Sequence, residues 1–230
     1  MMSEFDKFAE NYNESLRNSL ALTRTSDKYQ AEYKVRLLKN RLARGVAKTR
    51  GGTGLNVLDF GCGVGLSLPY LLEQFSGSKI YATDVSEVSL DVVRAELPQV
   101  TIINSALNAV EKLDVILMST VLHHITSSTR VEILENLRAN LKPDGCLVVI
   151  EHNTYNPLTR RIVSNCPMDV DAELISMRDI KKLLSADCGF KIRETGYCSF
   201  FPEPLKALTK LDPILKKIPL GGQYFVVATP

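Results

Sequence analysis

The sequence predicts a doubly wound α/β fold, in which helices cover both faces of a mostly parallel sheet. Three observations lead to this prediction. Short apolar runs alternate with helical stretches from residue 55 onward. The first run ends in a glycine-rich turn, and the second ends in an acid, Asp84. Short buried strands with helical crossovers are typical of parallel sheets, because each crossover places a helix over one face.

The elements follow one another at regular spacing. The predicted strands are 56–60, 79–84, 100–104, 115–119, 146–152, 190–200 and 223–228. The predicted helices between them are 66–75, 86–96, 128–140 and 176–185. Crossovers between parallel strands of one sheet are right-handed, so we expect that handedness throughout.

The first 50 residues are predicted to form a helical cover. Its first part repeats apolar side chains on one helical face: Phe5, Phe8, Tyr12 and Leu16. Ser26 and Asp27 are suited to cap a second helix, whose apolar stripe contains Tyr29, Tyr33 and Leu37. The glycine-rich stretch 50–54 then ends this helical pattern.

We expect one domain, spanning residues 1–230, because this length suits a single α/β unit with additions. The parts are the cover (1–50), the core (55–153) and two inserts (153–175 and 202–221). Inserts of this length in a compact domain are usually lids or binding loops.

Composition narrows the classes of function. Apolar residues make up 45% of the chain, which is ordinary for a globular protein with a core. The net charge is +2 and tryptophan is absent, so we expect no nucleic-acid partner. No stretch is apolar enough to span a bilayer, and the polar start is unlike a secretory signal. We therefore expect a cytoplasmic protein with at most peripheral membrane contact.

The cysteines give no framework for disulfides or metal. They are Cys62, Cys146, Cys166, Cys188 and Cys198. An odd number without CxxC pairs predicts neither a disulfide set nor a zinc site. We expect reduced thiols packed as small apolar groups, and no bound metal.

The glycine-rich turn is the central motif. VLDFGCGVG runs from a strand into a turn with glycines at 61, 63 and 65, and a helix follows. Glycine allows both a tight turn and close approach of a ligand to the backbone. The N–H groups at the start of the following helix are free to bind that ligand. Such a loop is common to several nucleotide-binding folds, including those that bind nicotinamide cofactors.

Three features narrow the ligand. The spacing is GxGxG, whereas a pyrophosphate site usually has its third glycine one residue later. Asp59, at the end of the strand, would repel a pyrophosphate and attract a cationic amino acid. Asp84 stands nineteen residues after Gly65, where an acid can accept both hydroxyls of an adenosine ribose.

With these motifs the chain resembles the class I S-adenosylmethionine (SAM)-dependent methyltransferases. The resemblance is carried by VLDFGCGVG, YATD, LDVILMSTVLHH and LKPDGCLVVIEHN, over roughly residues 55–153. It implies a Rossmann-like sheet of seven strands with the last strand antiparallel, here 223–228. It also implies SAM as cofactor and S-adenosylhomocysteine (SAH) as product.

The resemblance assigns cofactor residues by position. The loop under the methionine part of SAM comprises Asp59, Gly61, Cys62, Gly63 and Gly65, with Cys62 filling the space between glycines. Asp84 would hold the ribose, with Val85 beside it. Asn104, Ser105 and Ala106 would flank the adenine, although many members carry an acid near position 105. Tyr12 of the cover is a candidate to lie over the sulfonium.

All three histidines follow predicted strands. His123 and His124 come after the fourth strand, and His152 ends the fifth. Ligands of such sheets bind beyond the carboxyl ends of the strands. A histidine there can remove a proton from an acceptor hydroxyl, so these three are the catalytic candidates. A phosphate or carboxylate acceptor would need no base, and one histidine of the pair can instead bond only to backbone.

The inserts suggest the acceptor. The insert after His152 contains Tyr155, Arg160 and Arg161, which are candidates to bind it, and arginine grips phosphate or carboxylate. The insert 202–221 mixes lysines with apolar residues, as in an amphipathic lid or a surface that contacts anionic lipid. EHNTYNPLTRRIVSNCP and FFPEPLKAL resemble a subgroup of bacterial methyltransferases associated with surface-polysaccharide assembly. That resemblance implies a small or glycan-like acceptor, bearing phosphate or sugar.

The sequence therefore predicts methyl transfer from SAM, to oxygen of such an acceptor. Two alternatives stay open at this point. One is a nicotinamide-dependent oxidoreductase, which the GxGxG spacing disfavours. The other is a SAM-binding partner protein without catalytic activity. The identity of the acceptor and the oligomeric state are not specified by these patterns.

Overall fold

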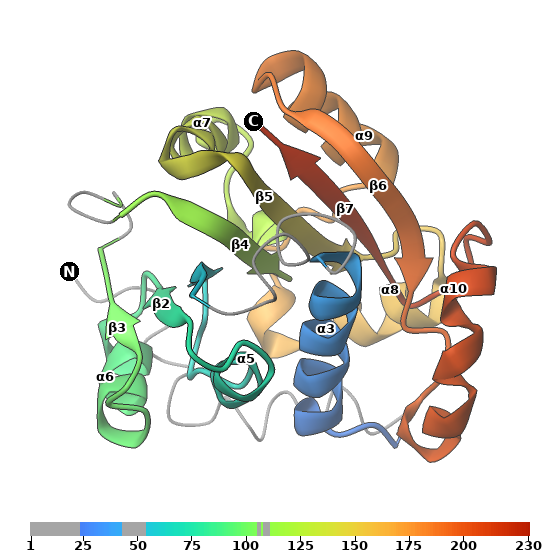
Figure 1. Ribbon diagram of the computed structural model, residues 1–230. Helices are drawn as coiled ribbons and strands as arrows, with labels where there is room; N and C mark the ends of the chain where they lie inside the picture. Colours follow the sequence, from blue (N-terminus) through green and yellow to red (C-terminus); the bar gives the residue numbers. More distant parts are fainter. Residues whose placement is uncertain (1–23, 43–53, 105–106, 108–110) are drawn as a thin grey trace.

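The computed structural model describes residues 24–42, 54–104, 107 and 111–230 of the chain. Its described part contains a seven-stranded sheet in the order β3-β2-β1-β4-β5-β7-β6 (Figure 1). The strands are β1 (Asn56–Phe60), β2 (Lys79–Thr83), β3 (Thr101–Ile102), β4 (Leu113–Ser119), β5 (Leu141–His152), β6 (Lys191–Cys198) and β7 (Gln223–Thr229). Strand β7 runs antiparallel to both of its neighbours, and the other pairs are parallel. The predicted fold class is confirmed.

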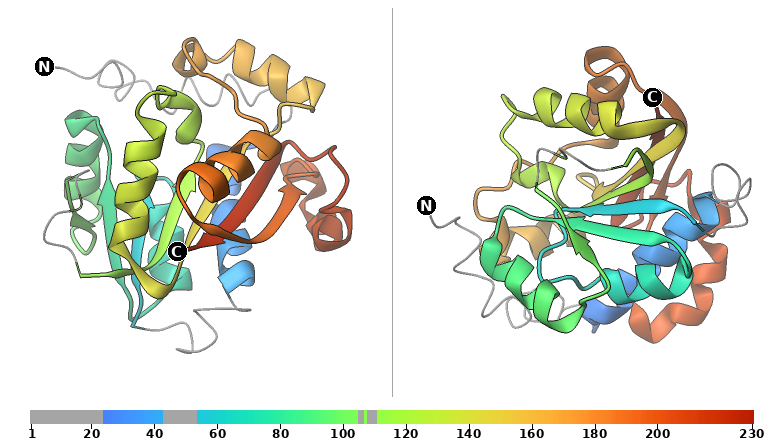
Figure 2. Two further views of the ribbon diagram at one scale, coloured as in Figure 1. Left: turned by 90° about the horizontal axis from the view of Figure 1, so that it is seen from above. Right: turned by 60° about the vertical axis from the view of Figure 1, so that its left-hand side comes forward.

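Helices pack on both faces of this sheet (Figure 2). One face carries α3 (Asp27–Leu42), α5 (Leu68–Gln74) and α6 (Glu87–Glu96). The other face carries α7 (Arg130–Asn140) and α9 (Met177–Lys182), which continues into a π-helical turn, η4 (Leu183–Asp187). The alternating faces of buried strands such as Leu147–Ile150 supply one layer of core to each side.

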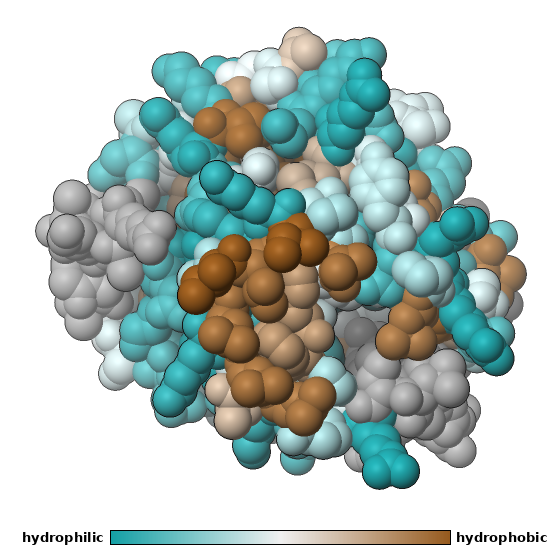
Figure 3. Space-filling model, turned by 90° about the vertical axis from the view of Figure 1, so that its right-hand side faces the viewer, coloured by the Kyte–Doolittle hydropathy of each residue, from teal (hydrophilic) through white to brown (hydrophobic). Residues whose placement is uncertain are grey.

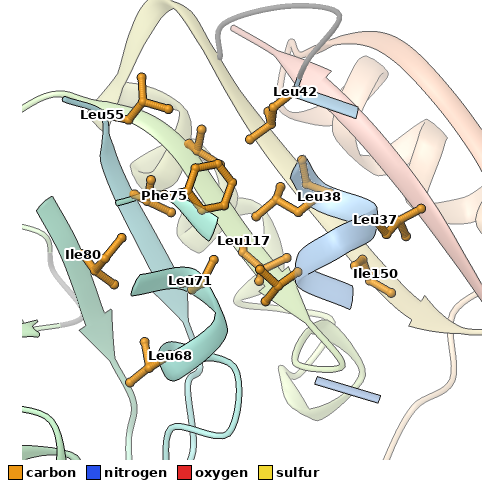
Figure 4. Close-up of a cluster of buried hydrophobic side chains, with 14 of the residues drawn as sticks. Leu37, Leu38, Leu42, Leu55, Leu68, Leu71, Phe75, Ile80, Leu117 and Ile150 are labelled. Carbon is orange, nitrogen blue, oxygen red and sulfur yellow. The ribbon is translucent and has the colours of Figure 1, made fainter. Parts of the chain in front are cut away.

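Helix α3 closes the core on the first face. Ser26 caps it as predicted, since its Oγ accepts a hydrogen bond from the backbone N–H of Tyr29 at 3.1 Å. Leu37, Leu38 and Leu42 point from this helix toward Phe75 and the strands (Figure 4). The earlier part of the predicted cover, including Phe5, Phe8, Tyr12 and Leu16, lies outside the described residues.

Two boundaries differ from the prediction. The third strand is only Thr101–Ile102, because Thr101 and Ile102 alone pair with β2. The fifth strand begins at Leu141 rather than at Cys146, because Leu141 already pairs with Leu113 before a register shift. Such a bulge cannot be seen in the apolar pattern, since Lys142, Pro143 and Asp144 interrupt it.

The two inserts are folded and flank one end of the sheet. The first contains α8 (Pro157–Ser164) and a 3-10 turn, η3 (Pro167–Asp169); the second contains a 3-10 segment, η5 (Glu203–Leu211), and α10 (Asp212–Leu215). Large apolar side chains of the second insert are exposed, and Figure 3 shows an apolar patch on the face that carries it: Leu205, Leu208, Leu211, Ile214, Ile218 and Leu220. Within the described ranges, no helix has the length and apolarity needed to cross a membrane.

Candidate active site

A cavity of about 1310 Å³ opens at the carboxyl ends of β1, β2, β4 and β5. Its walls include the glycine loop, the three histidines, helix α3 and both inserts. A pocket for one small ligand typically holds ~300–1,000 Å³. This cavity therefore has room for a cofactor and a second molecule beside it.

The glycine loop forms the floor below the end of β1. Gly61 and Gly63 both have positive φ angles, of 75° and 53°. A side chain on Gly61 would place its Cβ 2.5 Å from Val121 Cγ2, so the loop also needs glycine for close packing. The N–H groups of Gly61 and Cys62 donate to the carbonyl of Thr83, which ties the loop to β2.

Asp84 organises this loop as well as facing the cavity. Its Oδ2 accepts from the N–H of Gly63 at 2.7 Å, and its Oδ1 accepts from the N–H of Ser86 at 2.9 Å. Ser86 in turn caps α6 through the N–H of Ser89. Ser86, rather than Asp84, is therefore the cap of α6. Each oxygen of Asp84 retains a lone pair for a ligand hydroxyl.

A half-buried lysine lines the cavity together with Asp59. Lys34 of α3 lines the cavity with Asp59, and its Nζ lies 3.3 Å from Thr120 Oγ1. Burial lowers the pKa of Lys34, and burial raises the pKa of Asp59 to about 7, against the opposing charge of Lys34. The site thus pairs one cationic and one acidic group, which suits the carboxylate and ammonium of an amino acid.

Backbone strain marks the end of β4. Thr120 has a φ of 56° although it is not glycine, and it lies in the cavity wall between Ser119 and Val121. Its N–H donates to the carbonyl of Ile150 at 2.7 Å, which holds this conformation. Strained residues of this kind cluster at functional sites, and this one separates the glycine loop from the histidines.

The structure brings the three histidines together. The ring centroids of His123 and His124 are 4.1 Å apart, and those of His123 and His152 are 5.1 Å apart. All three line the cavity. Burial lowers the pKa of His152 to about 4, so this ring is neutral near pH 7.

His123 lies between two carboxylates, the buried Glu151 and the partly buried Asp169. Glu151 Oε2 lies 2.5 Å from His123 Nδ1, and Asp169 Oδ1 lies 3.4 Å from its Nε2. Burial alone would lower the pKa of His123, but the two carboxylates raise it well above its ordinary value. Glu151 also accepts hydrogen bonds from the N–H groups of Val121 and Leu122, which fixes its position.

Several residues that the sequence predicts for the site are not found in the cavity wall. Gly65 is not part of the cavity wall; it allows Val93 and Leu68 to pack close to the loop. Asn104 is exposed and outside the cavity, and its neighbours Ser105 and Ala106, like Tyr12, lie outside the described residues. The predicted acceptor residues also lie apart from the cavity: Tyr155 is exposed, and Arg160 and Arg161 line a smaller hollow beside it.

Other cavity residues were not predicted. Lys34, Asp169 and Gln223 face the cavity from α3, η3 and the start of β7. Gln223 Oε1 and Ser119 Oγ are buried without a hydrogen-bond partner among the described residues. The available signal was polarity at apolar positions, as for Glu151 within the run VVIEH. The cysteines agree with the prediction, because all five are free and four are buried.

The core of the chain matches a methyltransferase domain of known proteins. Residues 58–147 match the model of the methyltransferase domain family. A curated relative, trans-aconitate 2-methyltransferase of Azoarcus sp., is 28% identical over 133 residues. That match covers 56% of this chain and 52% of the relative, so the chain spans about half the length of the relative it matches.

Solved structures share the fold across almost the whole chain. A TehB-like SAM-dependent methyltransferase from Corynebacterium glutamicum superposes with a TM-score of 0.63 at 19% identity, covering 97% of this chain and 98% of that one. Magnesium protoporphyrin IX methyltransferase from Synechocystis with bound SAH gives 0.60 at 20% identity, with 97% and 96% covered. A chain of the Haloferax volcanii complex between a methyltransferase activator and a putative methyltransferase gives 0.66 at 15% identity, with 100% and 98% covered. The core of the chain therefore matches a methyltransferase domain, and its fold is that of SAM-dependent methyltransferases.

Proposed function

We propose that this chain, acting as one domain over residues 1–230, transfers a methyl group from SAM to an oxygen atom of a small or glycan-like acceptor that bears phosphate or sugar. The observation that supports this most directly is the shared cavity. It joins the glycine loop and Asp84 at one end to the histidine cluster at the other. A cofactor at the first end would point its methyl group along the carboxyl edge of the sheet toward the second.

The cofactor end offers complementary groups for each part of SAM. Asp59 faces the ammonium of the methionine part, and Lys34 faces its carboxylate. Asp84 and Val85 lie where the ribose would meet β2, and Gly61, Cys62 and Gly63 allow close approach of the backbone. The match of residues 58–147 to a methyltransferase domain supports SAM over a nicotinamide cofactor, which was the competing ligand for such a loop.

The reaction is an in-line displacement. A lone pair of the acceptor oxygen forms the new O–C bond while the C–S bond breaks, and SAH leaves as a neutral thioether. When the acceptor is a hydroxyl, its proton passes to His152, which ends β5 inside the cavity. When the acceptor is a phosphate or carboxylate, no proton moves. In both cases catalysis depends mainly on alignment and exclusion of water.

The acceptor end is polar and lies next to cationic side chains. Ser119 Oγ and Gln223 Oε1 offer hydrogen-bond partners from β4 and β7. Asp169 lines both the cavity and the hollow that holds Arg160 and Arg161. An acceptor that extends across Asp169 would place an anionic group over these arginines. The name of the Azoarcus relative gives trans-aconitate, a carboxylate, as its acceptor, which supports an anionic class.

The test measures SAH formation with the full chain and methyl-labelled SAM against a panel of acceptors. The panel contains monosaccharides, sugar phosphates, phosphorylated glycans and trans-aconitate. We expect turnover with anionic or sugar-bearing members and none with peptides, and mass spectrometry then locates the methyl on oxygen. SAH binding without turnover for any member would favour a silent SAM-binding partner instead. Binding of NAD instead of SAH would contradict the assignment of SAM as cofactor, and with it the proposed methyl transfer.

Variants then locate the acceptor end. His152→Ala and Gln223→Ala should lower turnover at least tenfold while SAH affinity, measured by calorimetry, stays within about twofold. Arg160→Ala and Arg161→Ala should raise KM for an anionic acceptor. Ser164→Ala, on the same helix and exposed, is the matched control. Unchanged rates in all four site variants would place the acceptor elsewhere.

A further inference from the structure

The histidine cluster has the arrangement of metal ligands. His123 Nε2 and His124 Nε2 lie 3.4 and 3.3 Å from the same oxygen, Asp169 Oδ1, and all three atoms lie within 4.8 Å of one another. Around a zinc-sized ion with bonds of ~2.0–2.2 Å, tetrahedral ligand atoms are separated by roughly 3.3–3.5 Å. Two of the three separations already match that geometry.

The hydrogen bonding of His123 leaves its Nε2 atom without a hydrogen-bond partner among the described residues. Nδ1 lies 2.5 Å from Glu151 Oε2, so this nitrogen carries the proton and donates it to the carboxylate. In a neutral ring, Nε2 then presents a lone pair. That atom is fully buried, has no geometrically formed hydrogen bond among the described residues, and points at a carboxylate oxygen. A lone pair that faces a carboxylate needs a proton or a cation between the two.

The surrounding charge favours a cation. Glu151 is 1% exposed and the side chain of Asp169 is 12% exposed, so two negative groups lie in a region with little water. Protonation of His123 supplies one positive charge there, and Lys34, whose Nζ bonds Thr120 Oγ1, adds a second positive charge that acts on Glu151. A divalent ion would balance both carboxylates with neutral imidazoles.

The outer partner of His123 is also typical of metal sites. Ligating histidines commonly donate their second N–H to a carboxylate, which fixes the ring and its tautomer. Glu151 has this place, and it is itself held by the N–H groups of Val121 and Leu122 at 3.0 and 2.8 Å. The ligands come from η2 (Leu122–His124) and η3, which are far apart in sequence, so no metal-binding spacing appears in the sequence.

We propose that His123, His124 and Asp169 bind one divalent transition-metal ion of the zinc class, with its remaining coordination positions open to the cavity. This differs from the sequence-based expectation of no bound metal. Three protein ligands with an open position are typical of catalytic rather than structural sites. If the proposed methyl transfer holds, the ion would polarise the acceptor oxygen, and His152 lies within reach of its proton.

The test uses the full chain, freed of any affinity tag and stripped of metal with EDTA. Calorimetric titration with ZnCl₂ should show one ion per chain with micromolar or tighter affinity. Asp169→Asn and His124→Ala should weaken binding at least tenfold. Glu151→Gln, which acts through His123, should weaken it ~10–100-fold. Asp171→Asn, an exposed carboxylate two residues from Asp169, is the matched control and should bind like the parent chain.

Two further measurements keep the outcome clear. Co²⁺ in place of Zn²⁺ should give visible absorption of a four- or five-coordinate site in the parent chain, and Asp169→Asn should lose it. Circular dichroism identifies any variant that fails to fold. Absence of saturable binding by the parent chain, or equal affinity in a folded Asp169→Asn chain, would overturn the proposal. SAH titration of the same samples separates the two ideas, since loss of the metal site leaves SAH binding intact.

Discussion

Asp84 shows how one carboxylate can both shape a loop and present itself to a ligand. It accepts the N–H of Gly63 and the N–H of Ser86, and it still lines the cavity. A substitution there removes a ligand contact and loosens the glycine loop together. Variants that separate the two effects are therefore needed at this residue.

Asp84→Ala should weaken SAM and SAH binding by ~1.5–3 kcal/mol, the scale of hydrogen bonds to a charged group. That corresponds to about tenfold to a hundredfold in affinity. Asp84→Asn retains an oxygen that can accept the N–H of Gly63, so it should lose less. Calorimetry with SAH measures both, and Asp91→Ala, an exposed acid of α6, is the control. Unchanged affinity in folded Asp84→Ala would remove the ribose assignment.

Two different roles are open to Lys34. Its ammonium can hold the carboxylate of SAM, or it can only neutralise Asp59. Lys34→Met keeps the length of the side chain and removes the charge. We expect SAH affinity to fall about tenfold, the scale of one charge-assisted hydrogen bond, with the thermal midpoint little changed. A lowered midpoint with normal affinity would show that Lys34 serves stability alone. Lys39→Met, on the exposed side of the same helix, is the control.

Single residues were predictable where their chemistry depends on neighbours in sequence. GxGxG with Asp59 and Asp84 needs only a strand, a turn and the next strand, and the structure places Asp59, Gly61, Gly63 and Asp84 in one wall. Lys34 and Asp169 were not predictable in this way. They reach the site through the packing of α3 and an insert, and a helical lysine is ordinarily solvated. The strain at Thr120 leaves no mark in composition either.

At the scale of elements, α3 is tied to the sheet and to the second insert by polar contacts. Arg41 bonds Glu194 of β6 at 2.7 Å and lies over the Phe225 ring, and Lys216 of the insert bonds the same Glu194 oxygen at 2.8 Å. At the other end, Tyr33 bonds Asp212 of α10, and its hydroxyl oxygen accepts the N–H of Ser199. The helix therefore positions the wall of the cavity that includes Lys34.

Glu194→Gln should lower the free energy of unfolding by about 1–3 kcal/mol at pH 7, because it leaves the partly buried Arg41 unpaired. Burial raises the pKa of Glu194, but Lys216 and Arg41 outweigh burial and hold it below 4.5. A depressed folded pKa stabilises the fold above the unfolded value, and that contribution is lost as the pH falls below 4.5. The difference between parent and variant, from urea unfolding at several pH values, should shrink below that point.

The control for Glu194→Gln is Glu96→Gln, which changes an exposed carboxyl at the end of α6. It should alter stability by less than about 0.5 kcal/mol, as expected for a surface substitution. If the difference in free energy of unfolding between the parent chain and Glu194→Gln did not change with pH, then shape rather than charge would hold α3 against β6.

Elements with strong periodicity were predicted well. Strands β1, β4 and β7 and helices α6 and α7 begin and end within a few residues of their predicted bounds. The third strand was overestimated, since apolar residues at 100–104 describe burial as well as pairing. The helices inside the two inserts were not predicted, because they lack the length that makes a helical pattern readable.

At the scale of the molecule, the cavity lies between the sheet edge and segments from both ends of the described chain. The 199–205 segment and α3 both line it and contact each other, since Glu203 accepts the N–H of Ser26 at 2.8 Å. Pro204, Leu205 and Leu220 of the second insert line the cavity, and the lid and the lipid-contacting surface both stay predictions for this segment.

Deletion of residues 1–20 should leave a folded domain with weaker SAM binding. The cap of α3 at Ser26 and its contacts with α10 do not use the deleted residues, so the core should persist. If Tyr12 lies over the sulfonium, as the sequence predicts, its loss should lower SAM affinity more than SAH affinity, because SAH carries no cation. Calorimetry with both ligands checks this. Equal affinity for SAM before and after deletion would rule out a cover role for this segment.

The position of β7 has a consequence for how the chain acquires its shape during synthesis. Among the described strands, β6 pairs only with β7, and β7 also pairs with the side of β5 that faces away from β4. While a ribosome is still producing residues before Gln223, five strands can assemble, but β5 keeps an unpaired edge and β6 has no partner. A nascent chain held at that stage would leave one edge of β5 and both edges of β6 unpaired, and unpaired edges promote aggregation. Chaperone dependence should therefore peak late in translation and fall once residues 223–229 have emerged.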